Sequence, residues 1–330
     1  MYKGATVGVV VPAYNESGFV GEVIETIPEF VDRVYAVDDG SSDRTWDEMQ
    51  AAAWRVNERA ATVASAAPDG GATSTRHVVT LRHEDNRGVG AAITTGYREA
   101  LADGMDVVAV MNGDGQMDPE ILDRIVDPVV EGEADYAKGN RLNDAHHRAA
   151  MSGWRLFGNV VLTFLTRVAS GYWRTTDPQN GYTAISREAL EALDFDVLHD
   201  HYGFCNDLLV RLNAAGMRVA DVPMRAVYGD EESHIRYRSF VPMLSWLLLV
   251  GFLWRLRTTY LDDGVHPLAA MYATGVAGWL GGVAGVAWWL ATGGDDGLRG
   301  VATVFLVGAV ALGLAVAAEW RTNGDLEVHR

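Results

Sequence analysis

Two long segments without a charged side chain, residues 267–294 and 300–318, lie in the last fifth of this chain. Each is long enough to cross a hydrocarbon core of about 30 Å as an α-helix, which rises about 1.5 Å per residue. Because only five residues separate the two segments, the sequence predicts a transmembrane helical hairpin. Gly278 and Gly282 have the spacing that lets two helices approach closely. The alternative, a buried hairpin in a soluble protein, is disfavoured by the length of both segments.

Short apolar runs rich in β-branched residues alternate with helix-like stretches in the first third of the chain. The predicted strands are 6–11, 34–37, 78–81 and 107–111, and the predicted helices are 18–27, 43–57 and 88–102. This alternation favours a parallel sheet with crossover helices, and continuously apolar strands indicate a sheet covered on both faces. The sequence therefore predicts an α/β domain, with a surface loop at 64–75.

The charges around the hairpin predict its orientation. Arg255, Arg257 and Arg321 flank its outer ends, whereas Arg299 in the short turn is offset by two aspartates. The N-terminal apolar run is short and lacks a cleavage site, so it does not predict a signal peptide. By the positive-inside rule we expect two transmembrane helices in the cell membrane, with the N-terminal domain and both termini in the cytoplasm. The single Cys205 fits a reducing compartment.

The chain is strongly acidic, with a formal net charge of −17. Of its 27 basic residues only Lys3 and Lys138 are lysines. An acidic surface with few lysines resembles proteins of extreme halophiles, so we expect a halophilic source. A nucleic-acid partner is not expected for a chain of this charge.

Two stretches contain no acidic residue, 145–176 and 233–261, and each holds four arginines. We expect them to face membrane lipids, through anionic headgroups or a lipid phosphate. An arginine-lined contact between helices is the alternative. Residues 240–254 are uncharged but short, which favours a helix lying in the membrane interface over a spanning one.

Polar sequence follows each of the four predicted strands. The segments are Pro-Ala-Tyr-Asn-Glu at 12–16, Asp-Asp-Gly-Ser-Ser-Asp at 38–43, Asp-Asn-Arg-Gly-Val-Gly-Ala at 85–91 and Asn-Gly-Asp-Gly-Gln-Met-Asp-Pro at 112–119. Ligands of open parallel sheets bind at the carboxyl ends of the strands. One such turn alone is often a helix cap, but four in this order predict a binding cleft.

In order and spacing these segments resemble glycosyltransferase family 2, and within it the dolichol-phosphate mannose or glucose synthases, over residues 5–235. The resemblance implies a GT-A fold, a nucleotide-sugar donor, Mg²⁺ or Mn²⁺, and inversion at the anomeric carbon. It implies that the donor is bound by Pro12, Tyr14, Glu16, Asp38, Asp39, Arg87 and Gly88. It also implies that Asn112, Asp114 and Gln116 hold the metal, and hard divalent cations prefer such oxygen ligands.

The resemblance has one departure, because the family usually has an aspartate where this chain has Asn112. An amide oxygen can still ligate, but with one formal charge less, so a lower metal affinity is expected. A membrane protein that binds nucleotide sugars without turnover therefore stays an alternative. Transfer to a glycan or to a lipid without a phosphate is another.

Three further segments resemble the family's acceptor side: residues 138–141, 176–182 and 228–236. The resemblance implies catalytic roles for Asp114, Asp177 and Arg141. It implies acceptor binding by Asn180, Asp207, Ser233, His234, Arg236 and Arg238. As alternatives, Asp177 would only cap the turn at Pro178, and His234 would be an ordinary loop residue.

A lipid monophosphate is already an oxyanion at neutral pH, since its second pKa is about 6. It needs positioning more than deprotonation, so we expect Asp177 to orient a substrate rather than to act as an obligatory base. The expected division is a catalytic domain at 1–232, an acceptor loop with an interfacial amphipathic helix at 233–265, and the hairpin with a short tail at 266–330. The expected reaction is inverting transfer of a hexose from UDP or GDP to dolichyl or polyprenyl phosphate, which supplies lipid-linked sugar for protein or surface glycosylation.

Overall fold

The computed structural model describes residues 1–66, 77–141, 153–225, 237–262, 264, 266–292 and 298–329. Its centre is an eight-stranded sheet in the order β3-β2-β1-β4-β6-β5-β7-β8. The strands are β1 (Val7–Ala13), β2 (Arg33–Asp38), β3 (His77–Arg82), β4 (Val107–Val110), β5 (Tyr136–Asn140), β6 (Thr183–Ser186), β7 (Val219–Pro223) and β8 (Glu327–His329). Only β6 runs antiparallel to its neighbours. The mostly parallel α/β sheet predicted from the sequence is therefore confirmed.

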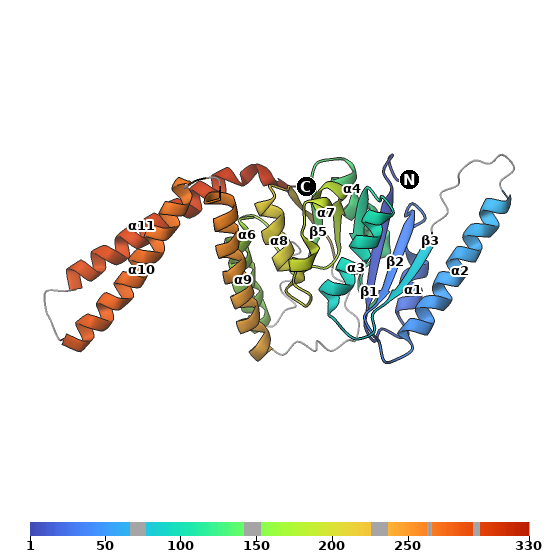
Figure 1. The fold of residues 1–330 in the computed structure, drawn as a ribbon, viewed down its shortest axis with the longest axis horizontal. Helices are drawn as coiled ribbons and strands as arrows, with labels where there is room; N and C mark the ends of the chain where they lie inside the picture. Colours follow the sequence, from blue (N-terminus) through green and yellow to red (C-terminus); the bar gives the residue numbers. More distant parts are fainter. Residues whose placement is uncertain are drawn as a thin grey trace.

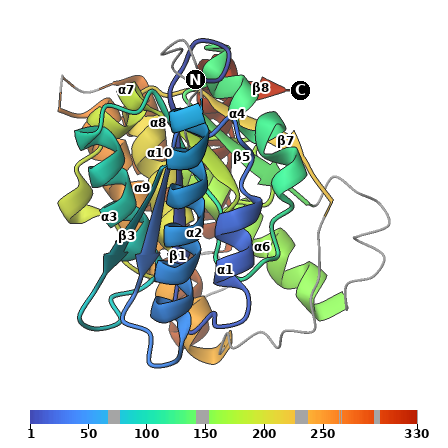
Figure 2. The same cartoon turned by 90° about the vertical axis from the view of Figure 1, so that its right-hand side faces the viewer.

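Helices cover both faces of this sheet. One face packs against α1 (Val20–Thr26), α2 (Thr45–Ala66) and α4 (Leu122–Val130), and the other against α3 (Val89–Ala102), α7 (Arg187–Glu191) and α8 (Phe204–Ala214). α1 and α2 lie side by side (Figure 2). Residues 64–66 continue α2 instead of opening the predicted loop, whose remaining residues lie outside the described ranges.

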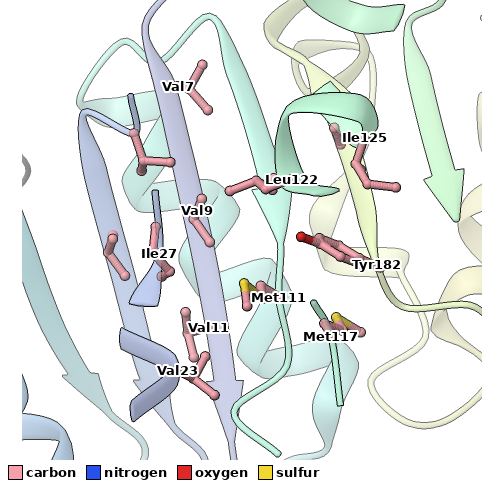
Figure 3. Packing of buried hydrophobic residues seen from close by; sticks show 14 of the residues in the cluster. Val7, Val9, Val11, Val23, Ile27, Met111, Met117, Leu122, Ile125 and Tyr182 are labelled. Atoms are coloured by element: carbon pink, nitrogen blue, oxygen red, sulfur yellow. The ribbon is translucent and has the colours of Figure 1, made fainter. Parts of the chain in front are cut away.

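Alternation along β1 explains why the strands are apolar throughout. Val7, Val9 and Val11 enter the core under α1 and α4, and Figure 3 shows Val9 near Leu122 and Val11 near Val23. Val10, between them in sequence, packs on the opposite face. Each strand therefore buries successive side chains in two different cores.

Three long apolar helices follow β7: α9 (Tyr237–Tyr260), α10 (Pro267–Thr292) and α11 (Leu298–Thr322). Each is long and apolar enough to cross a membrane. α10 and α11 form a hairpin that extends away from the sheet (Figure 1). A Cβ added at Gly278 would collide with the backbone of Gly308, so the small residues permit the close contact predicted from their spacing.

α9 packs against helices of the α/β domain. Leu244 and Leu248 contact Ala169 of α6 (Gly153–Ser170) and Val210 of α8. Its outward residues are apolar as well, and they include Val241, Met243, Trp246, Leu249, Val250, Leu253 and Trp254. The helix is longer than the predicted 240–254 because it continues past two arginines to Tyr260. An interfacial position for α9 stays a prediction.

Arg255, in that extension, corrects the prediction that the arginines of residues 233–261 face membrane lipids. Arg255 is fully buried, and its guanidinium pairs with Glu319 of α11 at 2.7 Å. Because it is buried, Arg255 does not face lipid headgroups. Burying an arginine is costly without an acidic partner, and Glu319 is that partner. For Arg255 the alternative of an arginine-lined helix contact is correct.

The chain after the hairpin returns to the sheet. The short turn η3 (Gly324–Leu326) leads into β8, which pairs in parallel with β7. The predicted short tail is thus an edge strand of the sheet. The expected domain boundary at 232 lies outside the described residues.

Candidate active site

A cleft of about 320 Å³ opens at the carboxyl ends of the parallel strands. Its lining includes the predicted donor and metal residues Pro12, Tyr14, Glu16, Asp39, Gly88, Asn112 and Asp114. Asp38, Arg87 and Gln116 are close in sequence but do not line it. Asn86, His201 and Tyr202 do line it, and the sequence did not predict them as donor residues.

Asp39 shapes this cleft through three internal contacts. Its carboxylate accepts hydrogen bonds from the backbone nitrogens of Arg87 at 3.0 Å and Gly88 at 2.7 Å. Nδ1 of His83 lies 2.7 Å from the same carboxylate. The turn after β3 is therefore fastened to the turn after β2, and donor binding by Asp39 stays a prediction.

Asp38 is fully buried beneath the same turn. It accepts a hydrogen bond from the backbone nitrogen of Ser41 at 3.1 Å and pairs with Nε of Arg82 at 3.0 Å. These contacts fix the start of the acidic turn.

The far wall of the cleft comes from residues 199–203, between the sheet and α8. The carbonyl of Asp200 accepts hydrogen bonds from the backbone nitrogens of Gly90 at 2.7 Å and Ala91 at 3.1 Å. A Cβ at Gly88, whose φ is +103°, would collide with the ring of His201. Glycine at position 88 therefore lets the wall close against the start of α3. A contact over more than 100 residues of sequence left no local signal, so His201 and Tyr202 were missed.

The turn after β4 presents oxygen atoms to the cleft. Oδ1 of Asp114 accepts a hydrogen bond from the backbone nitrogen of Gln116 at 3.0 Å. Gly113 lies against Ala13, which brings this turn beside the end of β1. Within the described ranges no three His, Cys, Asp or Glu side chains gather as a metal site. The amide of Asn112 and one carboxylate fit a hard cation only if other oxygens, such as those of a diphosphate, complete its shell.

A second polar centre joins Asp177 to Arg141. The Asp177 carboxylate, 6% exposed, accepts from Nε of Arg141 at 2.8 Å and from Nη2 at 2.9 Å. Buried Lys138 donates to the carbonyls of Thr176 and Asp177. Burial acts to raise the pKa of Asp177, but the hydrogen bonds and charge of Arg141 outweigh it, so this pKa lies below its usual range.

The two centres are adjacent. A Cβ at Gly181 would lie 3.6 Å from the side-chain amide of Asn112. Nδ2 of Asn180, beside that glycine, lies 3.4 Å from the Asp177 carboxylate. The predicted metal turn, the predicted catalytic residue Asp177 and the predicted acceptor residue Asn180 thus meet on one edge of the sheet.

Of the other predicted acceptor residues, the structure describes the side chain of Asp207, which is not brought into this arrangement. Asp207 is buried, pairs with Arg211 at 2.9 Å and accepts a hydrogen bond from the backbone nitrogen of His199. Arg238 lies in the first turn of α9. Ser233, His234 and Arg236 lie outside the described residues.

Comparisons with known proteins agree with this geometry. The family model for glycosyl transferase family 2 matches residues 8–194. UDP-N-acetylglucosamine–dolichyl-phosphate N-acetylglucosaminyltransferase of Methanococcus voltae is 27% identical over 67% of this chain and 85% of its own length. Undecaprenyl-phosphate mannosyltransferase of Micrococcus luteus is 30% identical over 66% of this chain and 82% of its own length.

A solved structure supports the fold assignment. Glucosyl-3-phosphoglycerate synthase of Mycobacterium tuberculosis, in complex with Mg²⁺ and UDP, superposes with a TM-score of 0.52. The match covers 76% of this chain and 79% of that one, at 22% identity. At this identity the likeness shows the shared GT-A fold, which confirms the fold expected from the sequence.

Proposed function

This chain belongs to glycosyl transferase family 2, and we propose that it transfers a sugar from a nucleotide-sugar donor to dolichyl or polyprenyl phosphate. The observation that carries the proposal is a cleft of about 320 Å³ at the strand ends of a domain that, in the described part of the chain, is joined to three apolar helices. The names of its relatives in Methanococcus voltae and Micrococcus luteus support a polyprenyl-phosphate acceptor. The product would supply lipid-linked sugar for protein or surface glycosylation.

On the donor side, the cleft would hold the nucleotide between the turns after β1, β2 and β3. Tyr14 is 44% exposed at its rim, where its ring can cover a base or ribose. Glu16 and Asp39 offer acceptors to ribose or base donors. Gly88 lets the wall at His201 close against the start of α3, which bounds this side of the cleft.

Asn112 and Asp114, which line the cleft, would hold Mg²⁺ or Mn²⁺ together with the donor diphosphate. Gln116, two residues after Asp114 in the same turn, is the third predicted ligand. A divalent cation there would balance charge on the departing nucleoside diphosphate. With only one carboxylate among the three, binding of the metal should depend on the presence of the donor.

On the acceptor side, a phosphate oxygen would form the new bond to the anomeric carbon as the bond to the nucleotide breaks. The electron pair leaves with the nucleoside diphosphate, and no proton has to be removed from the acceptor. The Arg141 side chain is 37% exposed and held in orientation by Asp177, so it can present N–H groups to a phosphate. Attack opposite to the leaving group would invert the anomeric centre.

The pairing of β8 supports a two-span topology. β7 precedes and β8 follows the three apolar helices, yet both belong to one sheet. If the helices enter a membrane, this pairing requires the chain between β7 and β8 to cross it an even number of times. We propose that α10 and α11 cross, while α9 lies at the membrane on the catalytic side, and that Arg257 and Arg321 place this side in the cytoplasm. In intact cells an impermeant thiol reagent should label an Arg299→Cys variant, but an Asp325→Cys variant only after permeabilisation.

The reaction is tested with membranes that contain the full chain and a panel of labelled UDP- and GDP-sugars with Mg²⁺ or Mn²⁺. We expect label in a lipid from which mild acid releases the sugar. The matched control is Asp114→Asn, which removes the carboxylate of the metal turn and should lose transfer. Label in an alkali-stable glycolipid would favour a non-phosphate acceptor. Donor binding without any transfer would favour the non-catalytic alternative.

The acidic composition supports the further proposal of a halophilic source. Activity that rises toward molar KCl would agree with it, and activity lost above about physiological salt would not.

A further inference from the structure

The chain that leaves the membrane hairpin contacts the loop that carries Asp177. We define the return segment as residues 319–327, from the last turn of α11 to the start of β8. Nδ2 of Asn323 donates to the carbonyl of Gly171 at 3.0 Å. The Glu327 carboxylate accepts from the backbone nitrogen of Arg174, at 2.6 and 2.9 Å to its two oxygens. The return segment is therefore hydrogen-bonded to the loop at both Gly171 and Arg174.

Side-chain packing adds to these hydrogen bonds. The guanidinium of Arg174 lies 5.4 Å from the ring centroid of Trp320, within range of a cation–π interaction. Asn323 and Glu327 are 7% and 9% exposed, so both hydrogen bonds are largely shielded from water. Shielded hydrogen bonds to a carboxylate are stronger than exposed ones.

The loop that the return segment contacts leads directly to Asp177, which pairs with Arg141. Thr176 donates to Asp221 of β7 through its backbone nitrogen at 2.8 Å and its hydroxyl at 3.0 Å. Asp221 is in register with His329 of β8. The loop is thus fixed to two adjacent strands, of which one exists only because the hairpin turns back.

Asp177 depends on such support, because its φ is +47°. A non-glycine residue in this region is strained and persists only where the surroundings impose the conformation. A shift of this residue would also move Arg141, whose guanidinium is held by its carboxylate.

The return segment is itself anchored to the helices at the membrane. Glu319 accepts from Arg255 of α9 at 2.7 Å and from the hydroxyl of Tyr272 of α10 at 2.8 Å. Nε of Arg255 donates to the carbonyl of Ala169, at the end of α6, at 2.8 Å. A continuous set of contacts therefore runs from the hairpin to the loop that precedes Asp177.

We propose that the return segment positions the acceptor side of the active site, with Glu327 as the positioning residue that holds the 171–176 loop. The inserted hairpin would thereby be required for transfer to the lipid phosphate, beyond its role as an anchor. This inference rests on the proposed function for the role of Asp177. The donor side is built from other parts of the chain, the turns after β1 to β4, the start of α3 and the wall at residues 199–203, and none of the residues lining it belongs to the return segment.

The test compares Glu327→Ala with wild type, using the full chain in vesicles of neutral lipid that contain dolichyl phosphate. We expect kcat/KM for the acceptor to fall by roughly tenfold or more, because small displacements of a positioned group are costly. The Kd of UDP or GDP, measured with Mn²⁺ present, should stay within about twofold of wild type. Asn323→Ala should change the acceptor kinetics in the same direction, and Glu327→Gln, which keeps an acceptor oxygen, should recover most of the loss.

Asp325→Ala is the matched control, since Asp325 is exposed in the same segment and should leave the kinetics unchanged. Unchanged acceptor kinetics in both Glu327→Ala and Asn323→Ala would overturn the proposal. Equal loss of nucleotide binding and transfer would also overturn it, because it would show that Glu327 maintains the whole domain. If wild type itself transferred nothing to dolichyl phosphate, the proposed function would fail instead, and the two failures are distinguishable.

Discussion

Asp177 is ionised across the neutral pH range and is already bound by a guanidinium. A carboxylate with a lowered pKa has little affinity for a proton, so it is poorly suited to accept one from a substrate. Its contacts fit the orienting role expected from the sequence. Because an acceptor phosphate brings its own negative charge, the site needs a well-placed cation such as Arg141 more than a base.

The Asp177→Asn variant should therefore lose roughly 10- to 100-fold in kcat/KM for the lipid phosphate, because Arg141 loses its charged partner. The shape of its pH profile should not change. The pKa of Asp177 lies below its usual range, so ionisation of the acceptor, near pH 6, should set the acidic limb. Initial rates from about pH 5 to 8.5 test this. Disappearance of that limb in the variant would identify Asp177 as the titrating base.

Asn112 sets the charge of the proposed metal turn. The Asn112→Asp variant should bind Mn²⁺ about tenfold more tightly in the absence of donor, because it adds a charged ligand beside Asp114. Electron paramagnetic resonance of free Mn²⁺ measures this affinity. Gln116→Glu is the comparison variant: it adds the same charge at the third predicted ligand, which does not line the cleft, so it should change the affinity less. Equal affinity of Asn112→Asp and wild type would remove Asn112 from the metal site.

Among the elements, α9 and α11 are joined by the buried pair of Arg255 and Glu319. Removing one partner of a buried pair leaves an uncompensated charge, so Glu319→Ala should destabilise the folded chain by about 3–5 kcal/mol. Arg257→Ala is the control on the same helix, because its contact to Asp262 is 3.5 Å long and exposed. Denaturant unfolding in one detergent measures both. Similar midpoints for the two variants would contradict the account.

The edge strand β8 predicts a dependence of stability on pH. Burial raises the pKa of Glu327 to about 7, whereas the undocked carboxyl keeps its ordinary pKa of 4.5. Between these values the docked segment binds more protons, so stability should fall as pH rises from about 4.5 to 7 and then level off. Glu327→Gln mimics the protonated form, so the difference in melting temperature between wild type and variant should shrink toward low pH. A difference independent of pH would show that Glu327 does not titrate in this range.

At the scale of the whole molecule, the sequence predicted the strands and turns that local sequence patterns encode. Continuous valine-rich runs gave β1 to β4 nearly at their observed bounds, and the polar turns after them supplied most of the cleft. The wall at His201 and Tyr202 was missed because it meets the cleft only through tertiary contacts. β8 was missed because three residues are too few to show a periodic pattern. Their pairing with β7 forms only once the hairpin has folded back.

Charge patterning was informative in sum but not residue by residue. The arginines around the hairpin gave an expected topology of two spans with both ends on one side, and the parallel pairing of β7 with β8 is compatible with two spans. Arg255 nevertheless proved to be buried, because its acidic partner lies 64 residues further along the chain. No window of local sequence reveals such a pairing.

The central claim is that the nucleophile is the phosphate of a polyprenyl lipid. The most direct measurement offers the purified full chain a matched pair of acceptors, a polyprenyl phosphate and the polyprenol of the same length, with labelled donor and Mg²⁺ or Mn²⁺. Mass spectrometry of the lipids should show one added sugar on the phosphate and none on the alcohol. Sugar on the alcohol, or donor consumed with neither lipid modified, would contradict the account.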